Sequence, residues 1–165
     1  MRIGHGYDLH RLKEGKGLHL GGFFMPCNYT TIAHSDGDVL CHAVIDSLLG
    51  ALALGDIGTH FPPSEERWRG ANSLEMLNVV YNEIVISQGF HLLNLDCTIV
   101  LEKIRLSLWN HEIRSHLLQG FQADDTVSVK LEQISVKAKT KEGVDAVGHG
   151  QAVEVYAVCL LQAQC

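Results

Sequence analysis

Alternating hydrophobic and polar positions predict the β-strands of this chain. Residues 93–101 and 134–138 alternate apolar and polar side chains, the period-2 pattern of strands with one face in a core. Residues 152–161 are apolar almost throughout, which is typical of a buried strand. Near the start, residues 3–12 and a segment with a glycine bend at residues 18–24 predict a pair of strands.

Apolar runs with helix-type boundaries predict three helices. The run over residues 38–54 follows the helix-start sequence at residues 35–38 and stops at Gly55. Residues 72–89 keep apolar positions at helical spacing and end in a glycine, and residues 108–120 carry a weaker helical pattern. Together these elements predict an α+β fold, a two-layer sandwich in which a mixed four-stranded sheet carries helices on one face.

Composition places the chain among globular proteins. Its 165 residues contain no linker or repeat, so we expect a single domain over residues 1–165. A net charge of −6 without a Lys/Arg cluster argues against nucleic-acid binding. The apolar stretches fall short of the about 20 residues that span a bilayer, and no secretory h-region begins the chain.

The cysteines indicate a reducing compartment. Their number is odd and no Cys-x-x-Cys pair occurs, so we expect reduced, mostly buried thiols in a cytoplasmic protein. They are Cys27, Cys41, Cys97, Cys159 and Cys165.

Histidine and aspartate spacing suggests a metal site. Residues two apart on a strand share a face, so Asp8 and His10 can reach one ion. The helix offers a third ligand from Asp38, His42 or Asp46, which lie along one face, and His42 is the natural one. Two imidazoles and one carboxylate favour zinc over magnesium and leave a position open for substrate. On these residues alone, a solvated polar strand end is the commoner explanation.

Three other segments combine groups that suit phosphate. His34 and Ser35 precede a helix N-terminus, where an anion can dock, although on sequence grounds simple N-capping by Ser35 or Asp36 is the commoner explanation. The turn-rich residues 56–65 either line a cleft or merely connect elements. Residues 137–142 offer three lysines, a hydroxyl and a carboxylate, which suit a diphosphate with a divalent ion, or form an ordinary charged strand end.

Matched blocks along the chain resemble one enzyme family. The blocks are densest in residues 1–10, 33–43 and 46–58, and continue through residues 61–73. Weaker matches follow at residues 94–96 and 136–138. The chain resembles the 2-C-methyl-D-erythritol 2,4-cyclodiphosphate synthase family.

The resemblance implies a cyclising reaction of the non-mevalonate isoprenoid pathway. The expected enzyme is a CMP-releasing phosphorus-oxygen lyase. It would be a homotrimer with active sites between neighbouring subunits. In its substrate, 4-diphosphocytidyl-2-C-methyl-D-erythritol 2-phosphate, the 2-phosphate would attack the β-phosphorus, and CMP would leave. Such chemistry asks mainly for positioning and charge neutralisation.

The resemblance also assigns residues. It implies one zinc per subunit on Asp8, His10 and His42, and a magnesium or manganese ion on Glu142 that bridges the diphosphate. It implies that His34 and Thr140 stabilise the transition state. The implied substrate contacts are Asp8, Leu9, His10, His34, Ser35, Asp46, Asp56, Ile57, Gly58, Phe61, Ser64, Glu65, Arg105, Lys139, Thr140, Lys141, Glu142 and His149.

Some positions depart from the family pattern. Lys139 and Lys141 replace two threonines, so diphosphate contact would be retained by charge. Residues 102–108 lack the proline of the cytidine loop, and Ala146 and His149 replace an aromatic residue and an arginine at the axial end of the trimer. Two alternatives stay open: a zinc-dependent phosphohydrolase that activates water, and a binding module without catalysis.

Overall fold

Five strands form the central sheet among the residues that the computed structural model describes, 1–62, 64–68, 70–122 and 128–164. Their order is β4-β1-β7-β5-β6; β5 and β6 run parallel, and the other neighbours are antiparallel. The predicted mixed sheet is confirmed, but the prediction of four strands is wrong, because a short edge strand adds a fifth. The strands are β1 (Arg2–Glu14), β4 (Tyr29–Ile32), β5 (Phe90–Val100), β6 (Ile134–Lys139) and β7 (Ala152–Ala163).

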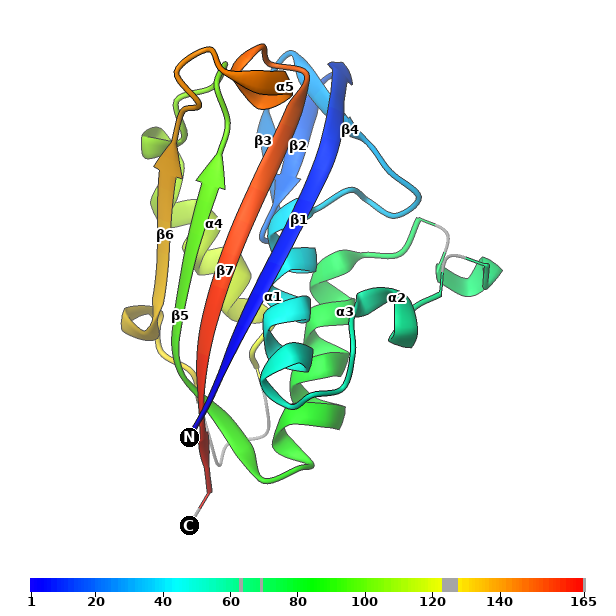
Figure 1. Ribbon diagram of the computed structural model, residues 1–165, viewed down its shortest axis with the longest axis vertical. Helices are drawn as coiled ribbons and strands as arrows, with labels where there is room; N and C mark the ends of the chain where they lie inside the picture. Colours follow the sequence, from blue (N-terminus) through cyan, green and yellow to red (C-terminus); the bar gives the residue numbers. More distant parts are fainter. Residues whose placement is uncertain (63, 69, 123–127, 165) are drawn as a thin grey trace.

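Helices lie on one side of this sheet (Figure 1). The central helix α1 packs against β1 and β7, α3 packs on α1, and α4 packs against β6. A separate hairpin of β2 (Gly17–Leu20) and β3 (Phe23–Pro26) lies beside them. The helices are α1 (Val39–Ala51), α2 (Ile57–His60), α3 (Ser73–Val79), its π-helical continuation η2 (Val80–Ile86), α4 (Asn110–Gln119) and α5 (Asp145–Gly148), with short 3-10 turns at Glu66–Trp68, Leu106–Leu108 and Leu131–Gln133.

Two glycines let α1 approach β1 closely. A Cβ atom on Gly4 would lie 1.8 Å from the carbonyl oxygen of Ser47, and one on Gly6 would lie 1.9 Å from that of Ala43. Any larger side chain would therefore collide with the helix backbone. The contact brings His42 of α1 next to the polar part of β1.

Asp38 fixes where α1 begins. Its buried side chain caps the helix by accepting from the backbone N–H groups of Leu40 (3.1 Å) and Cys41 (3.0 Å). The same carboxylate accepts from the N–H groups of Gly21 (2.9 Å) and Gly22 (2.6 Å) in the β2–β3 turn. The start of α1 is therefore tied to the hairpin.

Several predicted boundaries and faces need correction. Leu93 was expected in the core but is exposed. A β-bulge between Leu92 and Asn94 breaks the alternation, so the side chain of Leu92 faces the core instead. Ala138 is also exposed, at the end of β6. The first predicted helix is shorter than expected, and the second ends as a π-helix at Ile86.

The described thiols are free and mostly buried. Cys41, Cys97 and Cys159 lie in the core and Cys27 is partly exposed, while Cys165 lies outside the described residues. In the described part of the chain, no helix has both the length and the apolar character to cross a membrane.

Candidate metal centre

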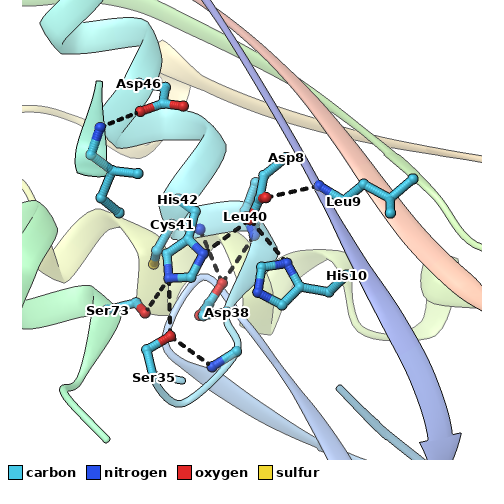
Figure 2. Close-up of polar contacts among 12 residues, drawn as sticks. Asp8, Leu9, His10, Ser35, Asp38, Leu40, Cys41, His42, Asp46 and Ser73 are labelled. Carbon is cyan, nitrogen blue, oxygen red and sulfur yellow. Dashed lines mark hydrogen bonds and ion pairs between the residues drawn. The ribbon is translucent and has the colours of Figure 1, made fainter. Parts of the chain in front are cut away.

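Asp8, His10 and His42 converge where β1 meets α1 (Figure 2). Asp8 and His10 share the face of β1 that points at α1, as the strand pattern predicted. Asp8 Oδ2 lies 2.9 Å from His42 Nδ1 and 3.1 Å from His10 Nδ1. The potential ligand atoms of the three residues all lie within 4.8 Å of one another, close enough to hold one ion.

The charges of this cluster favour a cation. Burial acts to raise the pKa of Asp8, but the close polar groups and charges of His10 and His42 outweigh it and lower that pKa to about 2. Burial acts to lower the pKa of His42, but the hydrogen bond and charge of Asp8 outweigh it and raise that pKa. Asp8 is therefore an anion at neutral pH that attracts either a proton on His42 or a metal ion.

The nitrogen Nδ1 of His10 indicates that the centre suits a metal. This atom is buried and, among the described residues, has no hydrogen-bond partner of acceptable geometry, although Asp8 Oδ2 is near. A buried polar atom without a partner is unfavourable, and a cation held between the three side chains would satisfy it. Two imidazoles and one carboxylate are ligands of the kind that zinc prefers, so the residues fit a divalent ion of this type.

A pocket of about 250 Å³ opens beside the cluster. Its lining combines three histidines and a serine with largely apolar side chains. The structure thus brings together five of the predicted contact residues with two of the metal-ligand candidates. The lining residues are His10, His34, Ser35, His42, Ile57, Gly58, Phe61, Trp68 and Met76.

Two predicted aspartates support the pocket wall instead of facing the cluster. Asp46 accepts a hydrogen bond from the backbone N–H of Ile57 at 2.7 Å, which ties α1 to α2. Asp56 caps α2 by accepting from the N–H (2.9 Å) and the hydroxyl (2.8 Å) of Thr59. Of the three acidic or histidine positions offered by the helix, only His42 reaches the cluster, because Asp38 and Asp46 bind backbone N–H groups.

Three predicted contacts lie away from the pocket lining. Leu9 points its side chain to the other face of β1, and only its backbone N–H reaches Asp8 Oδ1, at 2.8 Å (Figure 2). Ser64 and Glu65 are exposed, and Glu65 pairs with Arg67 at 2.6 Å. Pro63 of the same loop lies outside the described residues.

The remaining predicted residues do not line the pocket. Thr140 and Glu142 follow β6, which β5 and β7 separate from β1. The hydroxyl of Thr140 donates to Glu142 Oε1 at 2.6 Å. Lys139 ends β6, Arg105 lies in the loop after β5, and His149 follows α5; all three are exposed. Within one chain, these residues are not brought to the metal cluster.

Lys141 is engaged by its own chain. Its amine pairs with Glu154, a buried carboxylate on β7 that also accepts from the hydroxyl of Tyr7 at 3.3 Å. Its backbone N–H donates to Glu102 Oε2 at 2.8 Å. The hydrogen bond to Glu154 raises the pKa of Lys141. The lysine therefore links the turn that carries Thr140 and Glu142 to β7 and to Glu102.

Sequence reasoning missed four residues of the site. Trp68 and Met76 line the pocket, and Ser73 and Asp36 extend from His42 through hydrogen bonds. Ser73 gave only a helix-start signal and Asp36 only a capping signal. No spacing pattern connects residues 37 positions apart, so their contact depends on the tertiary fold.

Together, the mixed sheet, the His/Asp cluster and the adjoining pocket define an α+β protein with a metal-type centre at a helix–sheet junction. The sequence profile of the YgbB family matches residues 1–162. The 2-C-methyl-D-erythritol 2,4-cyclodiphosphate synthase of Treponema denticola is 45% identical over 161 residues, which cover 98% of this chain and 96% of that one. The chain therefore belongs to the YgbB family, the 2-C-methyl-D-erythritol 2,4-cyclodiphosphate synthases.

Solved structures agree with this assignment. IspF of Plasmodium falciparum, in a CDP complex, is 32% identical with a TM-score of 0.84, and the match covers 99% of this chain and 97% of that one. The bifunctional IspDF of Campylobacter jejuni is 31% identical with a TM-score of 0.88. There the match covers 98% of this chain and 42% of the longer protein.

Proposed function

We propose that this chain converts 4-diphosphocytidyl-2-C-methyl-D-erythritol 2-phosphate to 2-C-methyl-D-erythritol 2,4-cyclodiphosphate with release of CMP, in non-mevalonate isoprenoid biosynthesis. The observation that carries the proposal is the Asp8/His10/His42 cluster beside a pocket, in a chain 45% identical to a relative named for this product. The CDP bound in the Plasmodium falciparum structure supports a cytidine diphosphate portion in the substrate. We place the enzyme in the cytoplasm, as one domain over residues 1–165.

The reaction is an intramolecular phosphoryl transfer. An oxygen of the 2-phosphate forms a bond to the β-phosphorus, and the bond from that phosphorus to the oxygen bridging to the α-phosphate breaks. The bridging oxygen leaves with CMP, and no water is consumed. Because the attacking and leaving groups belong to one molecule, the protein mainly holds them in line and neutralises charge.

The metal centre is assigned to Asp8, His10 and His42. Zinc held there, one per subunit, would polarise a phosphate oxygen as a Lewis acid. His34 and Ser35 line the same pocket, where they can donate hydrogen bonds to the substrate phosphate. Asp46 and Asp56 hold α2, so Ile57, Gly58 and Phe61 present a fixed wall to the carbon skeleton of the substrate.

The diphosphate and nucleotide are assigned to the turn after β6. Thr140 would stabilise the transition state, and Glu142 would bind magnesium or manganese between the phosphates. Lys139 and Arg105 supply positive charge. The amine of Lys141 pairs with Glu154 of β7. We therefore propose that Lys141 stabilises this turn, in addition to any contact that it makes with the diphosphate. The remaining expected contacts are Leu9, Ser64, Glu65 and His149.

A homotrimer would join these two groups of residues. The sheet face away from the helices exposes apolar side chains, including Ile3 (72% exposed), Tyr7 (43%) and Val158 (42%). Such a face favours burial against other copies of the chain. Since Thr140 and Glu142 lie across the sheet from the metal cluster, an active site that uses both would draw them from a neighbouring subunit.

The nature of the product tests the proposal. The 4-diphosphocytidyl substrate should be incubated in ¹⁸O-labelled water and followed by ³¹P NMR and mass spectrometry. We expect one CMP per cyclic diphosphate and no ¹⁸O in either product. Labelled phosphate products would indicate a phosphohydrolase, and zinc binding without turnover would indicate a binding module.

A further inference from the structure

His42 is held on its outer side by a hydrogen-bond chain. His42 Nδ1 faces Asp8, whereas Nε2 lies 2.9 Å from the hydroxyl oxygen of Ser73 (Figure 2). The Ser73 hydroxyl in turn lies 2.5 Å from Asp36 Oδ1. Asp36 Oδ2 also accepts a hydrogen bond from the backbone N–H of Ser73 at 3.0 Å, so the carboxylate binds both the hydroxyl and the N–H of this serine.

The chemistry of the three groups sets the direction of the chain. An ionised carboxylate only accepts hydrogen bonds, so the single hydroxyl proton of Ser73 points to Asp36. The Ser73 oxygen can then only accept from His42, which requires a proton on Nε2. On the other side of the ring, the Asp8 carboxylate at 2.9 Å attracts a proton or a cation to Nδ1. With the proton kept on Nε2, a cation that displaces the proton from Nδ1 meets the lone pair of that nitrogen.

Ser35 does not select between the two tautomers. Its hydroxyl oxygen lies 3.3 Å from the same Nε2 and accepts from the backbone N–H of Gly37 at 3.2 Å. Its hydroxyl proton can be donated to a bare Nε2, and its oxygen can accept from a protonated one. The preference for one tautomer therefore depends on Ser73 and Asp36.

We propose that Ser73 and Asp36 are positioning residues that hold His42 in the Nε2–H tautomer and so reserve Nδ1 for the metal. The inference rests on the metal centre of the proposed function and deepens it. Outer partners of this kind orient a ligating imidazole and increase its basicity, and losing them weakens metal affinity about 10- to 100-fold. Ser73 is fully buried, so its hydroxyl serves this chain and not the substrate.

Zinc affinity and the Nε2 proton of His42, both measured without substrate, test the proposal. Ser73→Ala should weaken zinc binding about 10- to 100-fold in competition with a chelating indicator. In long-range ¹H–¹⁵N spectra of the zinc-bound protein, the Nε2 proton of His42 should exchange slowly with solvent in the wild type and faster in the variant, which lacks the buried acceptor. Ser47→Ala is the matched control, because this buried serine donates only to the carbonyl of Val44, at 2.7 Å, and should leave both readouts unchanged.

Two further variants keep the test decisive if Ser73→Ala does not fold. Ser73→Thr retains the hydroxyl and should stay near wild-type affinity, whereas Asp36→Asn should weaken zinc binding and speed the exchange of the Nε2 proton. Wild-type affinity and slow exchange of the Nε2 proton in Ser73→Ala or Asp36→Asn would overturn the positioning role. A wild type that binds no zinc would instead overturn the metal centre itself, so the two failures are distinguishable.

Discussion

One carboxylate oxygen of Asp8 lies 2.9 Å from an imidazole nitrogen of His42 and 3.1 Å from one of His10, and these contacts determine how the centre responds to protons. Its pKa of about 2 keeps it ionised through the range in which histidines titrate. The raised pKa of His42 means that a proton competes for Nδ1 already above the ordinary value of 6.5. We expect the apparent zinc affinity to fall as pH is lowered from about 8 to about 6. Indicator competition across this range measures it, and a pH-independent affinity would contradict the assignment of His42.

Residue patterns predicted part of this site. Strand parity placed Asp8 and His10 together because alternation on a strand is a local property of the backbone. Local patterns do not decide which of the three helix positions is the ligand. The tertiary structure decides it, because Asp38 and Asp46 accept hydrogen bonds from backbone N–H groups and His42 does not. The Ser73 contact depends on how α3 packs against α1, which no local pattern encodes.

At the scale of elements, the approach of α1 to β1 determines whether the centre forms. Gly6→Ala would place a methyl group 1.9 Å from the Ala43 carbonyl oxygen, so α1 must move away. We expect a loss of about 1–3 kcal/mol in the free energy of unfolding, together with weaker zinc binding. Urea denaturation of the metal-free protein and a zinc titration measure the two effects.

Gly50→Ala is the matched control for that substitution. Gly50 also lies on α1, but the nearest atom to a Cβ there is the His5 carbonyl oxygen at 3.7 Å. Because alanine favours helix over glycine, we expect unchanged stability or a gain of up to about 1 kcal/mol. Equal stability of the two alanine variants would refute the close-approach argument.

The start of α1 depends on Asp38. Asp38→Ala would leave the N–H groups of Gly21, Gly22, Leu40 and Cys41 without their acceptor. We expect a loss of about 3 kcal/mol or more in urea denaturation, because a helix cap and the anchor of a hairpin turn disappear together. Asn72→Ala, which removes the exposed cap of α3, should cause a clearly smaller loss; equal losses would argue against the anchoring role.

Elements were predicted where their pattern is strong. The long strands and α1 follow from alternation and from an apolar run with a cap. β4 was missed because none of its four residues is buried and they show no alternation; its position is set by pairing with the end of β1. The bulge in β5 could not be found because Leu92 and Leu93 are both apolar, although only Leu92 is buried.

At the scale of the whole molecule, the metal cluster and the pair of Thr140 and Glu142 lie apart within one chain. We therefore expect an active site to form only where two subunits meet. His42→Ala and Glu142→Gln should each be inactive alone. If the two variants are refolded together into mixed assemblies of the proposed homotrimer, each active site should have one chance in two of an intact metal cluster and one in two of an intact Glu142. About a quarter of the wild-type activity should therefore return. Mixed trimers, verified by native mass spectrometry, that show no activity would contradict a site shared between subunits.

The measurement that tests the account most directly is CMP release from the 4-diphosphocytidyl substrate. Wild type, metal-stripped wild type with and without added zinc, and His42→Ala should be compared for CMP and the cyclic diphosphate. We predict that the wild type forms both products, that stripping abolishes them and zinc restores them, and that His42→Ala forms neither. Cyclic product from the stripped protein or from His42→Ala at the wild-type rate would contradict the assignment of the Asp8, His10 and His42 cluster as the catalytic metal centre.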